Sequence, residues 1–180
     1  SYVITNNTIA NNSAYQGGGI YYYYHYEDVT NTIIYGNTAS NSGNQVYFGT
    51  GGTHPDFYYC DIEGGKEDFA GNTFTGVYEK NKDIDPLFVD AGSGDYSLQS
   101  TSPLINYGKP DISGLNIPET DVIGNPRIYP GIYERIDFGA YEFYGNPDPT
   151  YDIFTDLETI DFGYLTINST FISEFKIENQ

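Results

Sequence analysis

The sequence predicts an all-β chain that winds as a parallel β-helix, and three observations lead to this fold. Residues 6–14 (NNTIANNSA) return as residues 31–39 (NTIIYGNTA), 25 positions later. The apolar residues alternate with a period of two, which is typical of strands and excludes helical repeats. Asparagine and glycine recur between the short apolar runs, where a corner needs a left-handed backbone conformation. Coils of this length would stack on one another at the strand spacing.

The second half of the coil repeats as well, so each coil contains two short strands. Residues 18–23 (GGIYYY) align with residues 44–49 (NQVYFG), which places Ile20 over Val46. A third coil begins at residues 58–65 (YYCDIEGG), once the glycine-rich insertion before it is allowed for. The repeat therefore predicts two coils and the start of a third.

These coils form the first predicted domain, residues 1–65, which we interpret as the last coils of a longer β-helix. Each coil needs neighbours to cover its faces, and a solenoid needs about three or more repeats to be stable. Further coils, and any signal peptide, are therefore expected before Ser1.

Five tyrosines and one histidine crowd residues 21–26, and strand alternation divides them between two faces. Tyr22 and Tyr24 are expected to point into the coil. The outward rings either stabilise the sheet as a cross-strand ladder or stack against sugar rings, and the sequence leaves both alternatives open. The predicted carbohydrate-binding residues on this outward face are Tyr21, Tyr23 and Tyr47.

The segment after the coils is rich in proline and glycine and is predicted to cover the open end of the β-helix. Residues 86–89 (PLFV) and 95–99 (DYSLQ) read as short strands on either side of a turn, and residues 135–143 (RIDFGAYEF) as a closing strand. Such a cap would protect the strand edges of the last coil. We assign residues 66–143 to this end-covering region.

Five motifs follow one another in the order found in a known family. In chain order they are NTIIYGNTASNSGNQVYFG, YCDIEGG, DIDPLFVDAGSGDYSLQSTSPLINYG, DVIGNPRI and DFGAYEF. Over residues 28–143 the chain resembles the choice-of-anchor Q region of secreted bacterial right-handed β-helix proteins with the pectin-lyase-like fold. The resemblance implies a right-handed coil, an extracellular or cell-surface location in a bacterium, and a modular parent protein.

The last part of the chain is predicted to be a separate module. Residues 144–152 (YGNPDPTYD) form a proline-rich linker. Residues 153–180 contain two alternating strands and resemble the first strands of the ASPM-SPD-2-Hydin or choice-of-anchor D immunoglobulin-like modules. Two strands cannot bury a sandwich core, so this part is expected to be an incomplete immunoglobulin-like β-sandwich.

Charge and composition exclude several classes of partner. Seven basic residues stand against 25 acidic ones, which gives a net charge of −18 and argues against nucleic acid as a partner. No apolar run reaches the roughly 18 residues that span a bilayer, so membrane insertion is not expected. The single cysteine, Cys60, excludes an internal disulfide and is interpreted as a buried apolar residue.

Polysaccharide lyases and hydrolases occur on this fold, but the coils supply few of the groups they need. A lyase needs Lys or Arg to remove a proton, and no Lys or Arg precedes Lys66. A hydrolase needs two facing carboxylates, for which Asp61 and Glu63 on one outer face are the candidates. We interpret this pair as part of a turn and read neither His25 nor His54 as a ligand or base. No catalytic residue is predicted.

A weak calcium site is predicted around the turn DAGSGD, because Ca²⁺ takes six to eight oxygen ligands and this stretch is dense in carboxylates. The alternative is that each aspartate caps its own turn through side-chain hydrogen bonds to the backbone. The four predicted metal ligands are Asp83, Asp85, Asp90 and Asp95.

The sequence thus favours a non-catalytic C-terminal part of a secreted or surface-displayed bacterial β-helix protein that serves display, adhesion or glycan contact. Polysaccharide and further domains of the same parent chain are the expected partners. The alternative is the non-catalytic end of a polysaccharide lyase or glycoside hydrolase whose active site lies in upstream coils. A calcium-stabilised adhesin is a third hypothesis. Whether the parent is an enzyme stays open.

Overall fold

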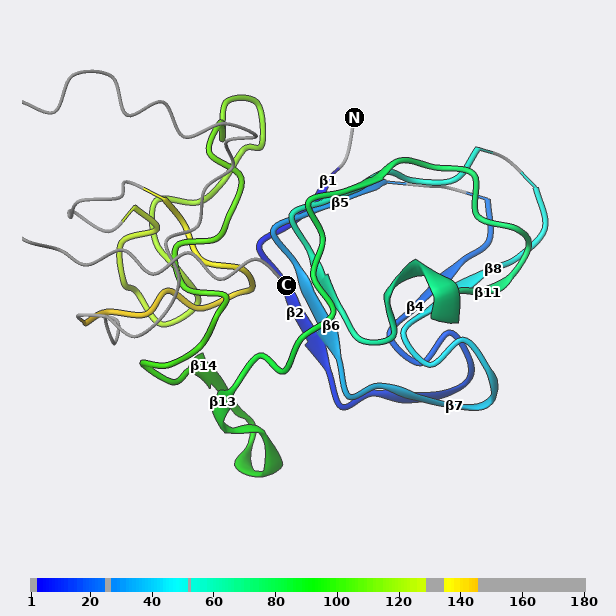
Figure 1. Ribbon diagram of the computed structural model, residues 1–180, viewed down its shortest axis with the longest axis horizontal. Helices are drawn as coiled ribbons and strands as arrows, with labels where there is room; N and C mark the ends of the chain where they lie inside the picture. The colour runs from blue at the N-terminus through cyan, green and yellow to red at the C-terminus, as the bar shows by residue number, and fades with distance from the viewer. Residues whose placement is uncertain (1–2, 25–26, 52, 129–134, 146–180) are drawn as a thin grey trace, which may run out of the picture.

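The computed structural model describes residues 3–24, 27–51, 53–128 and 135–145. Within them, short parallel strands stack in register along ladders of two to four strands. Figure 1 looks nearly along the stack, so that successive coils overlie one another as a ring. The prediction of a parallel β-helix is confirmed.

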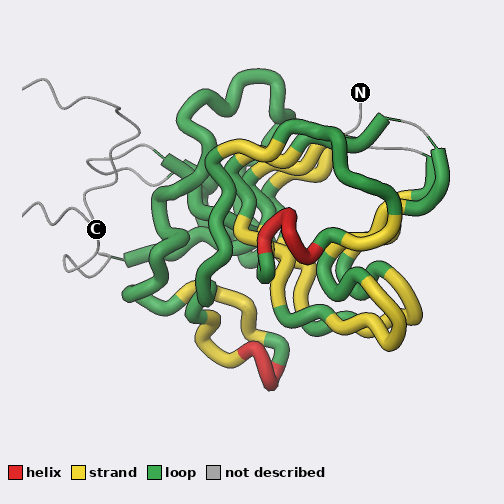
Figure 2. Tube along the Cα trace, turned by 45° about the vertical axis from the view of Figure 1, so that its right-hand side comes forward, coloured by secondary structure: helices red, strands yellow, loops and turns green. Residues whose placement is uncertain are grey.

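Four ladders make up the coils, and Figure 2 shows their strands lying side by side. The first ladder contains β1 (Val3–Thr5), β5 (Asp28–Thr30), β9 (Phe57–Tyr58) and β12 (Tyr78–Glu79). The second contains β2 (Thr8–Ala10), β6 (Ile33–Tyr35) and β10 (Asp61–Ile62). The third contains β3 (Ser13–Gln16) and β7 (Thr38–Ser42). The fourth contains β4 (Ile20–Tyr22), β8 (Val46–Phe48) and β11 (Ala70–Gly71).

The register of these ladders agrees with the repeat in the sequence. Ile34 pairs with both Ile9 and Ile62, and Ile20 pairs with Val46. Because partners in a parallel ladder point to the same side, the aliphatic residue at each position packs on its equivalents above and below. The register predicted from the repeat is therefore confirmed.

The corner after the first ladder is left-handed in every coil. Asn6, Asn31, Tyr59 and Lys80 each follow the last strand residue and have φ values of 51°, 50°, 52° and 56°. Asparagine tolerates this conformation because its short polar side chain bonds locally, whereas tyrosine and lysine adopt it at a cost. The later corners keep this conformation without asparagine.

The coil interior holds one continuous apolar core. Its largest fully buried members are Phe48, Phe57, Ile34, Ile62 and Val46. Cys60 is also fully buried there, as predicted, and burial raises the pKa of its thiol to about 12. This core joins the coils into one folded unit.

Parallel pairing continues beyond residue 65. The short helix η1 (Gly65–Asp68) leads into β11, which pairs with β8, and β12 then pairs with β9. An isolated parallel bridge between Asp61 and Lys82 adds the start of a fourth layer. The last coils therefore extend about 17 residues further than the sequence repeat indicated. Their strands have only two residues each and do not match the repeated sequence of the earlier coils, so the repeat does not reveal them.

The segment after Lys82 packs on a side of the coils, whereas the sequence analysis placed it over an open end. It begins with an antiparallel hairpin made of β13 (Phe88–Asp90), η2 (Ala91–Ser93) and β14 (Asp95–Leu98). A second core joins Leu98, Leu104 and Phe138 of this segment to Ile33 of β6. Figure 1 shows this segment to the left of the β2 and β6 ladder. We name residues 84–143 the side segment.

The physical reason why the side segment packs on the coils lies in β6, whose two isoleucines point in opposite directions. Ile34 is fully buried in the coil, and Ile33 is 1% exposed although it points out of the coil. An outward isoleucine needs a cover, since leaving its side chain in water costs about 1.5 to 3 kcal/mol. A strand that is covered on both faces reads as a continuous apolar run.

The two predicted segments at the end of the chain lie mostly or wholly outside the described residues. The linker is described only at Tyr144 and Gly145, and the immunoglobulin-like strands predicted at residues 153–180 lie outside the described residues. In the part of the chain that the structure describes, no helix has the length and apolar character needed to cross a membrane.

Candidate functional site

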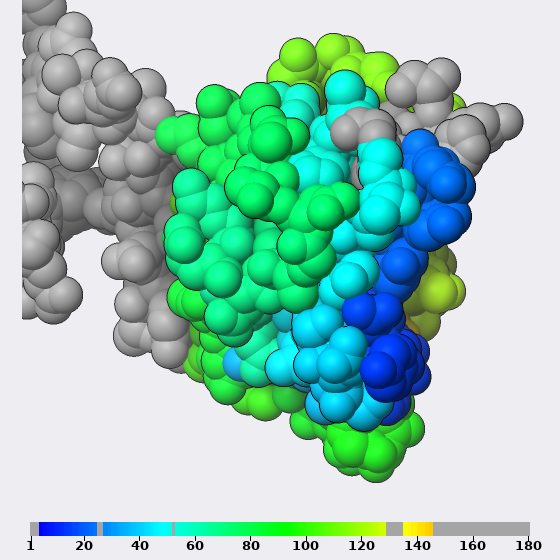
Figure 3. Space-filling model, turned by 90° about the vertical axis from the view of Figure 1, so that its right-hand side faces the viewer, coloured from blue at the N-terminus to red at the C-terminus, as the bar shows by residue number. Residues whose placement is uncertain are grey.

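The candidate site begins on the outer face of β4 and β8 and continues past the end of β4. It is a group of four tyrosines that we call the tyrosine surface: Tyr21, Tyr23, Tyr24 and Tyr47. Tyr21, Tyr23 and Tyr24 are 44%, 50% and 61% exposed, and Tyr47 is half-buried. Figure 3 faces this side of the molecule, with the coils following one another from blue through cyan to green. The three predicted carbohydrate-binding residues are therefore together and accessible.

The rings of the tyrosine surface form one connected chain of contacts. Tyr21 and Tyr47 are register partners, and their rings stack with centroids 5.0 Å apart and planes at 16°. The ring of Tyr23 lies 6.3 Å from that of Tyr21 and 4.2 Å from that of Tyr24, which it meets edge to face. The surface therefore runs along the stack from Tyr47 to Tyr21 and then around the coil to Tyr24.

Tyr24 was predicted to point inward, and this prediction is wrong. Tyr22 does face the interior, where it is 4% exposed and its ring stacks on Phe48 with centroids 5.5 Å apart. However, β4 ends at Tyr22, and the chain bends at the next two residues. Because strict alternation holds only within a strand, it no longer fixes the direction of Tyr24.

Two glycines form the floor under these rings. A Cβ atom at Gly49 would lie 3.0 Å from the Tyr23 ring and 3.1 Å from the Tyr21 hydroxyl oxygen. A Cβ atom at Gly51 would lie 3.4 Å from the Tyr24 ring, and its φ of 98° favours glycine in any case. The glycine-rich insertion thus allows the rings to lie close to the backbone.

This arrangement supports both alternatives for the tyrosines. The stacked pair is the cross-strand ladder, in which Tyr21 and Tyr47 each cover one face of the other's ring. The more exposed rings of Tyr23 and Tyr24 offer aromatic carbon against which the C–H face of a sugar can pack, and the phenol hydroxyls can exchange hydrogen bonds with sugar hydroxyls.

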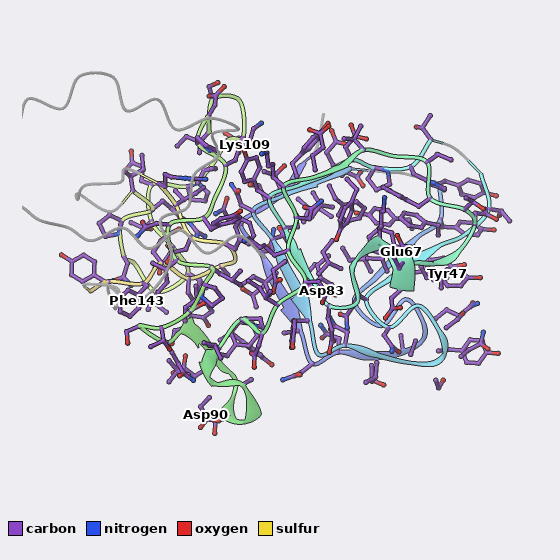
Figure 4. The ribbon with its side chains drawn as sticks, viewed as in Figure 1. Tyr47, Glu67, Asp83, Asp90, Lys109 and Phe143 are labelled. Carbon is purple, nitrogen blue, oxygen red and sulfur yellow. The ribbon has the colours of Figure 1, made fainter. Side chains whose placement is uncertain are left out.

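The four predicted calcium ligands are not brought together. Asp83 accepts a hydrogen bond from the Gly64 amide at 2.9 Å, and Asp85 accepts one from the Leu87 amide at 2.9 Å. Figure 4 shows Asp83 beside the coils and Asp90 on the distant hairpin. Among the described residues, no group of three or more His, Cys, Asp or Glu is placed to hold a metal ion.

The other two aspartates of this set cap their own turns. Asp90 accepts hydrogen bonds from the amide and the hydroxyl of Ser93, at 3.2 and 2.7 Å. Asp95 accepts them from the amide and the hydroxyl of Ser97, at 3.0 and 2.6 Å. These bonds hold the pKa of Asp95 below its ordinary value. The geometry is that of local turn capping, the alternative left open by the sequence.

The acid pair considered for hydrolysis does not face an open cleft. Asp61 is fully buried beneath the side segment, where its Oδ1 accepts a hydrogen bond from the Ile84 amide at 3.1 Å. Burial raises the pKa of Asp61 to about 7. Glu63 accepts hydrogen bonds from the Gln45 side chain at 2.6 Å and from the Gly36 amide at 2.9 Å. Both carboxyl groups therefore serve the packing of the coil.

Of the two histidines, only His54 falls within the described residues, and it belongs to the aromatic packing of the coil. Its ring lies 4.5 Å from that of Phe48, and its Nδ1 accepts a hydrogen bond from the Thr75 amide at 3.0 Å. Burial lowers the pKa of His54, so the imidazole is neutral near pH 7.

Sequence reasoning missed a buried acidic network within the side segment. Arg127 and Glu142 form a salt bridge of 3.0 Å, and the second Glu142 oxygen accepts from the Asp137 amide at 2.9 Å. Asp121 accepts from the Glu142 amide at 2.9 Å. Burial raises the pKa of both Asp137 and Glu142, and the negative charge of Asp137 raises the pKa of Glu142 further. The motifs DVIGNPRI and DFGAYEF contain all four residues. However, the sequence of a motif does not show that its side chains contact those of the other motif.

A groove lies where the hairpin meets the coils, and it has a volume of about 270 Å³. Tyr35 and Asn11 line it from the coils, and Asp85, Phe88 and Gln99 from the side segment. Asn11 reaches across to the Tyr96 hydroxyl at 3.3 Å. The groove is therefore part of the junction between the two cores.

Comparison with protein-family models, with curated proteins and with solved structures finds no match for this chain. The structure itself shows a mostly-β protein with many short parallel sheets in a repeating pattern. Functional assignment therefore depends on the chemistry of the tyrosine surface.

Proposed function

We propose that this chain is a non-catalytic, carbohydrate-contacting part of a secreted or surface-displayed bacterial β-helix protein, and that the tyrosine surface makes the contact. The observation that carries the proposal is the continuity of the four rings, three of them between 44% and 61% exposed on one outer face. Tyrosine is well suited to this role, because it joins a flat apolar ring to a polar hydroxyl group.

The cost of exposing these rings also supports a binding role. Contiguous exposed aromatic area is unfavourable in water and commonly marks an interaction site. A cross-strand ladder would need only the register partners Tyr21 and Tyr47, whereas Tyr23 and Tyr24 lie beyond the paired strand. The ladder alone therefore does not account for the surface.

Glycan-array binding of the whole chain tests the proposal. A variant with Ser at all four positions of the tyrosine surface should lose binding, because each lost aromatic contact contributes about 0.5 to 1.5 kcal/mol. The matched control carries Tyr15→Ser and Tyr144→Ser, two rings that are 70% and 66% exposed outside the tyrosine surface. Circular dichroism would establish that both variants fold. Binding that survives in the four-residue variant would refute the proposal.

A further inference from the structure

We propose that the tyrosine surface selects uncharged polysaccharides and rejects uronate polymers. This inference rests on the proposed function and goes beyond it by naming the class of glycan. It follows from the charges around the rings.

The two coils that carry the tyrosine surface have no cation of their own. Residues 1–65 contain five acidic residues and neither Lys nor Arg. Proteins hold sugar carboxylates with Arg or Lys, which supply charge-assisted hydrogen bonds, in the case of Arg often two at once. Without such a residue, a uronate on these rings would have to give up part of its hydration with no ionic partner in return.

One flank of the surface is acidic through Glu27 and Asp28, which follow the tyrosines in the chain. Glu27 also lies close to β4, because the Tyr22 hydroxyl donates a hydrogen bond to the Glu27 carbonyl oxygen at 3.4 Å. Burial is the main cause that raises the pKa of Tyr22, and the charges of Glu27 and Asp28 add to the same effect. Two carboxylates therefore follow within four positions of Tyr24, the last ring of the tyrosine surface.

The other flank is acidic through η1, which carries Glu67 and Asp68 and one cation, Lys66. Tyr47 pairs with Ala70, only three residues after Glu67. All three charged residues of η1 are exposed. The helix thus contributes one net negative charge close to the end of the ring chain.

Charges at this range matter for a polyanion and not for a neutral chain. Screening in about 0.1 M salt acts over about 10 Å, so each carboxylate of a uronate chain laid on the rings would be repelled by one or both flanks. An uncharged sugar has the same C–H faces and hydroxyl groups without this penalty. The surface therefore distinguishes the two by electrostatics alone.

Matched oligosaccharides test the selectivity on the full chain. The probes are β-1,4-linked hexamers of glucose, mannose and galactose, and the same three hexamers oxidised at C6 to uronates. We expect at least one neutral hexamer to bind at least about tenfold more tightly than its uronate in about 0.01 M salt, and the ratio to shrink in about 1 M salt. Calorimetric titration supplies the affinities.

A charge variant separates this electrostatic account from shape. Glu67→Gln with Asp68→Asn leaves Lys66 as the only charge on η1, and it should raise uronate affinity several-fold without changing neutral binding. The control, Asp111→Asn with Glu119→Gln, removes two exposed charges from the side segment and should change neither affinity.

Failure of the inference and failure of the proposed function give different results. A uronate that binds as tightly as its neutral partner, and that is lost on replacing the four tyrosines with Ser, would overturn the selectivity and keep the site. Binding of no hexamer, or binding that does not depend on the tyrosines, would overturn the proposed function and the selectivity with it.

Discussion

The Lys109 amide donates a hydrogen bond of 2.7 Å to the side-chain oxygen of Asn31, although the two residues are 78 positions apart. Asn31 also accepts a bond from the Gly139 amide at 2.7 Å through its backbone carbonyl. Its side-chain amide donates to Asn6 of the preceding coil. One fully buried asparagine at a coil corner thus fastens the side segment to the β-helix.

Asn31→Gly should loosen this junction. Glycine keeps the left-handed corner, so the loss is that of the side-chain bonds, and we expect about 2 to 3 kcal/mol less stability in urea unfolding. Hydrogen exchange of the Lys109 amide should also accelerate. The control is Asn116→Gly, at an exposed corner with a φ of 52°, where the change should stay within about 0.5 kcal/mol. Equal effects of the two variants would contradict the fastening role.

Arg127→Met should destabilise the side segment, most strongly at high pH. The variant leaves the carboxyl groups of Glu142 and Asp137 buried without a cation, which costs about 3 to 5 kcal/mol when they are charged. Because their pKa values are raised, lowering the pH neutralises them and shrinks the cost. Urea unfolding at pH 6 and pH 9 measures this difference. Arg135→Met, outside the network, is the control, and an equal pH dependence there would count against the network.

Asp61→Asn should flatten part of the dependence of stability on pH. The folded-state pKa of Asp61 is about 7, above its ordinary value of 3.8, so the folded state holds this proton more tightly. The stabilisation that comes from this bound proton is fully present below about pH 4. It is lost as the pH rises to about 7, by up to about 1.4 kcal/mol per pH unit. Asp83, Asp85 and Lys82 carry the neighbouring charges.

Urea midpoints between pH 4 and pH 8 would show this effect. Asparagine keeps an acceptor for the Ile84 amide, so the variant should fold, and it should be more stable than the natural protein at pH 8. An unchanged slope would show that Asp61 ionises normally in the folded protein.

Gly49→Ala should weaken glycan binding without removing any tyrosine. The added methyl group would lie 3.0 Å from the Tyr22 carbonyl oxygen and from the Tyr23 ring, so that ring and the Tyr21 hydroxyl must move. We expect a several-fold loss of affinity in the glycan titration with little change in the circular dichroism spectrum. Gly92→Ala, where a Cβ atom has ordinary contacts, is the control. Full affinity in the first variant would show that ring placement is not critical.

Calcium should leave the melting temperature unchanged. Asp85, Asp90 and Asp95 bond to amides or hydroxyls of their own turns, and Asp83 bonds to the Gly64 amide of the coils, so the four carboxylates are held on separated parts of the fold. Calorimetric scans with Ca²⁺ and with a chelator should therefore superimpose. A rise in melting temperature that depends on Ca²⁺ would restore the calcium-stabilised adhesin hypothesis.

The sequence by itself determined the β-helix and its register. A repeat of about 25 residues with Ile34 aligned to Ile9 and Ile62 admits one way to stack the coils, because equivalent apolar residues must share one interior. It also determined that Tyr21 and Tyr47 would be neighbours, since that contact follows from the same register. Local alternation and repetition are enough for such features.

Only the tertiary structure decided what covers the outside of the coils. Alternation shows that Ile33 and Asp61 point outward, but whether water or another segment meets them depends on contacts with residues far along the chain. The salt bridge between Arg127 and Glu142 joins two loops that contain no sequence repeat from which it could be predicted. Tyr24 lies past a strand end, where the pleat no longer sets its direction. Long-range packing, which no local pattern encodes, fixed the cover over Ile33 and Asp61 and the pairing of Arg127 with Glu142.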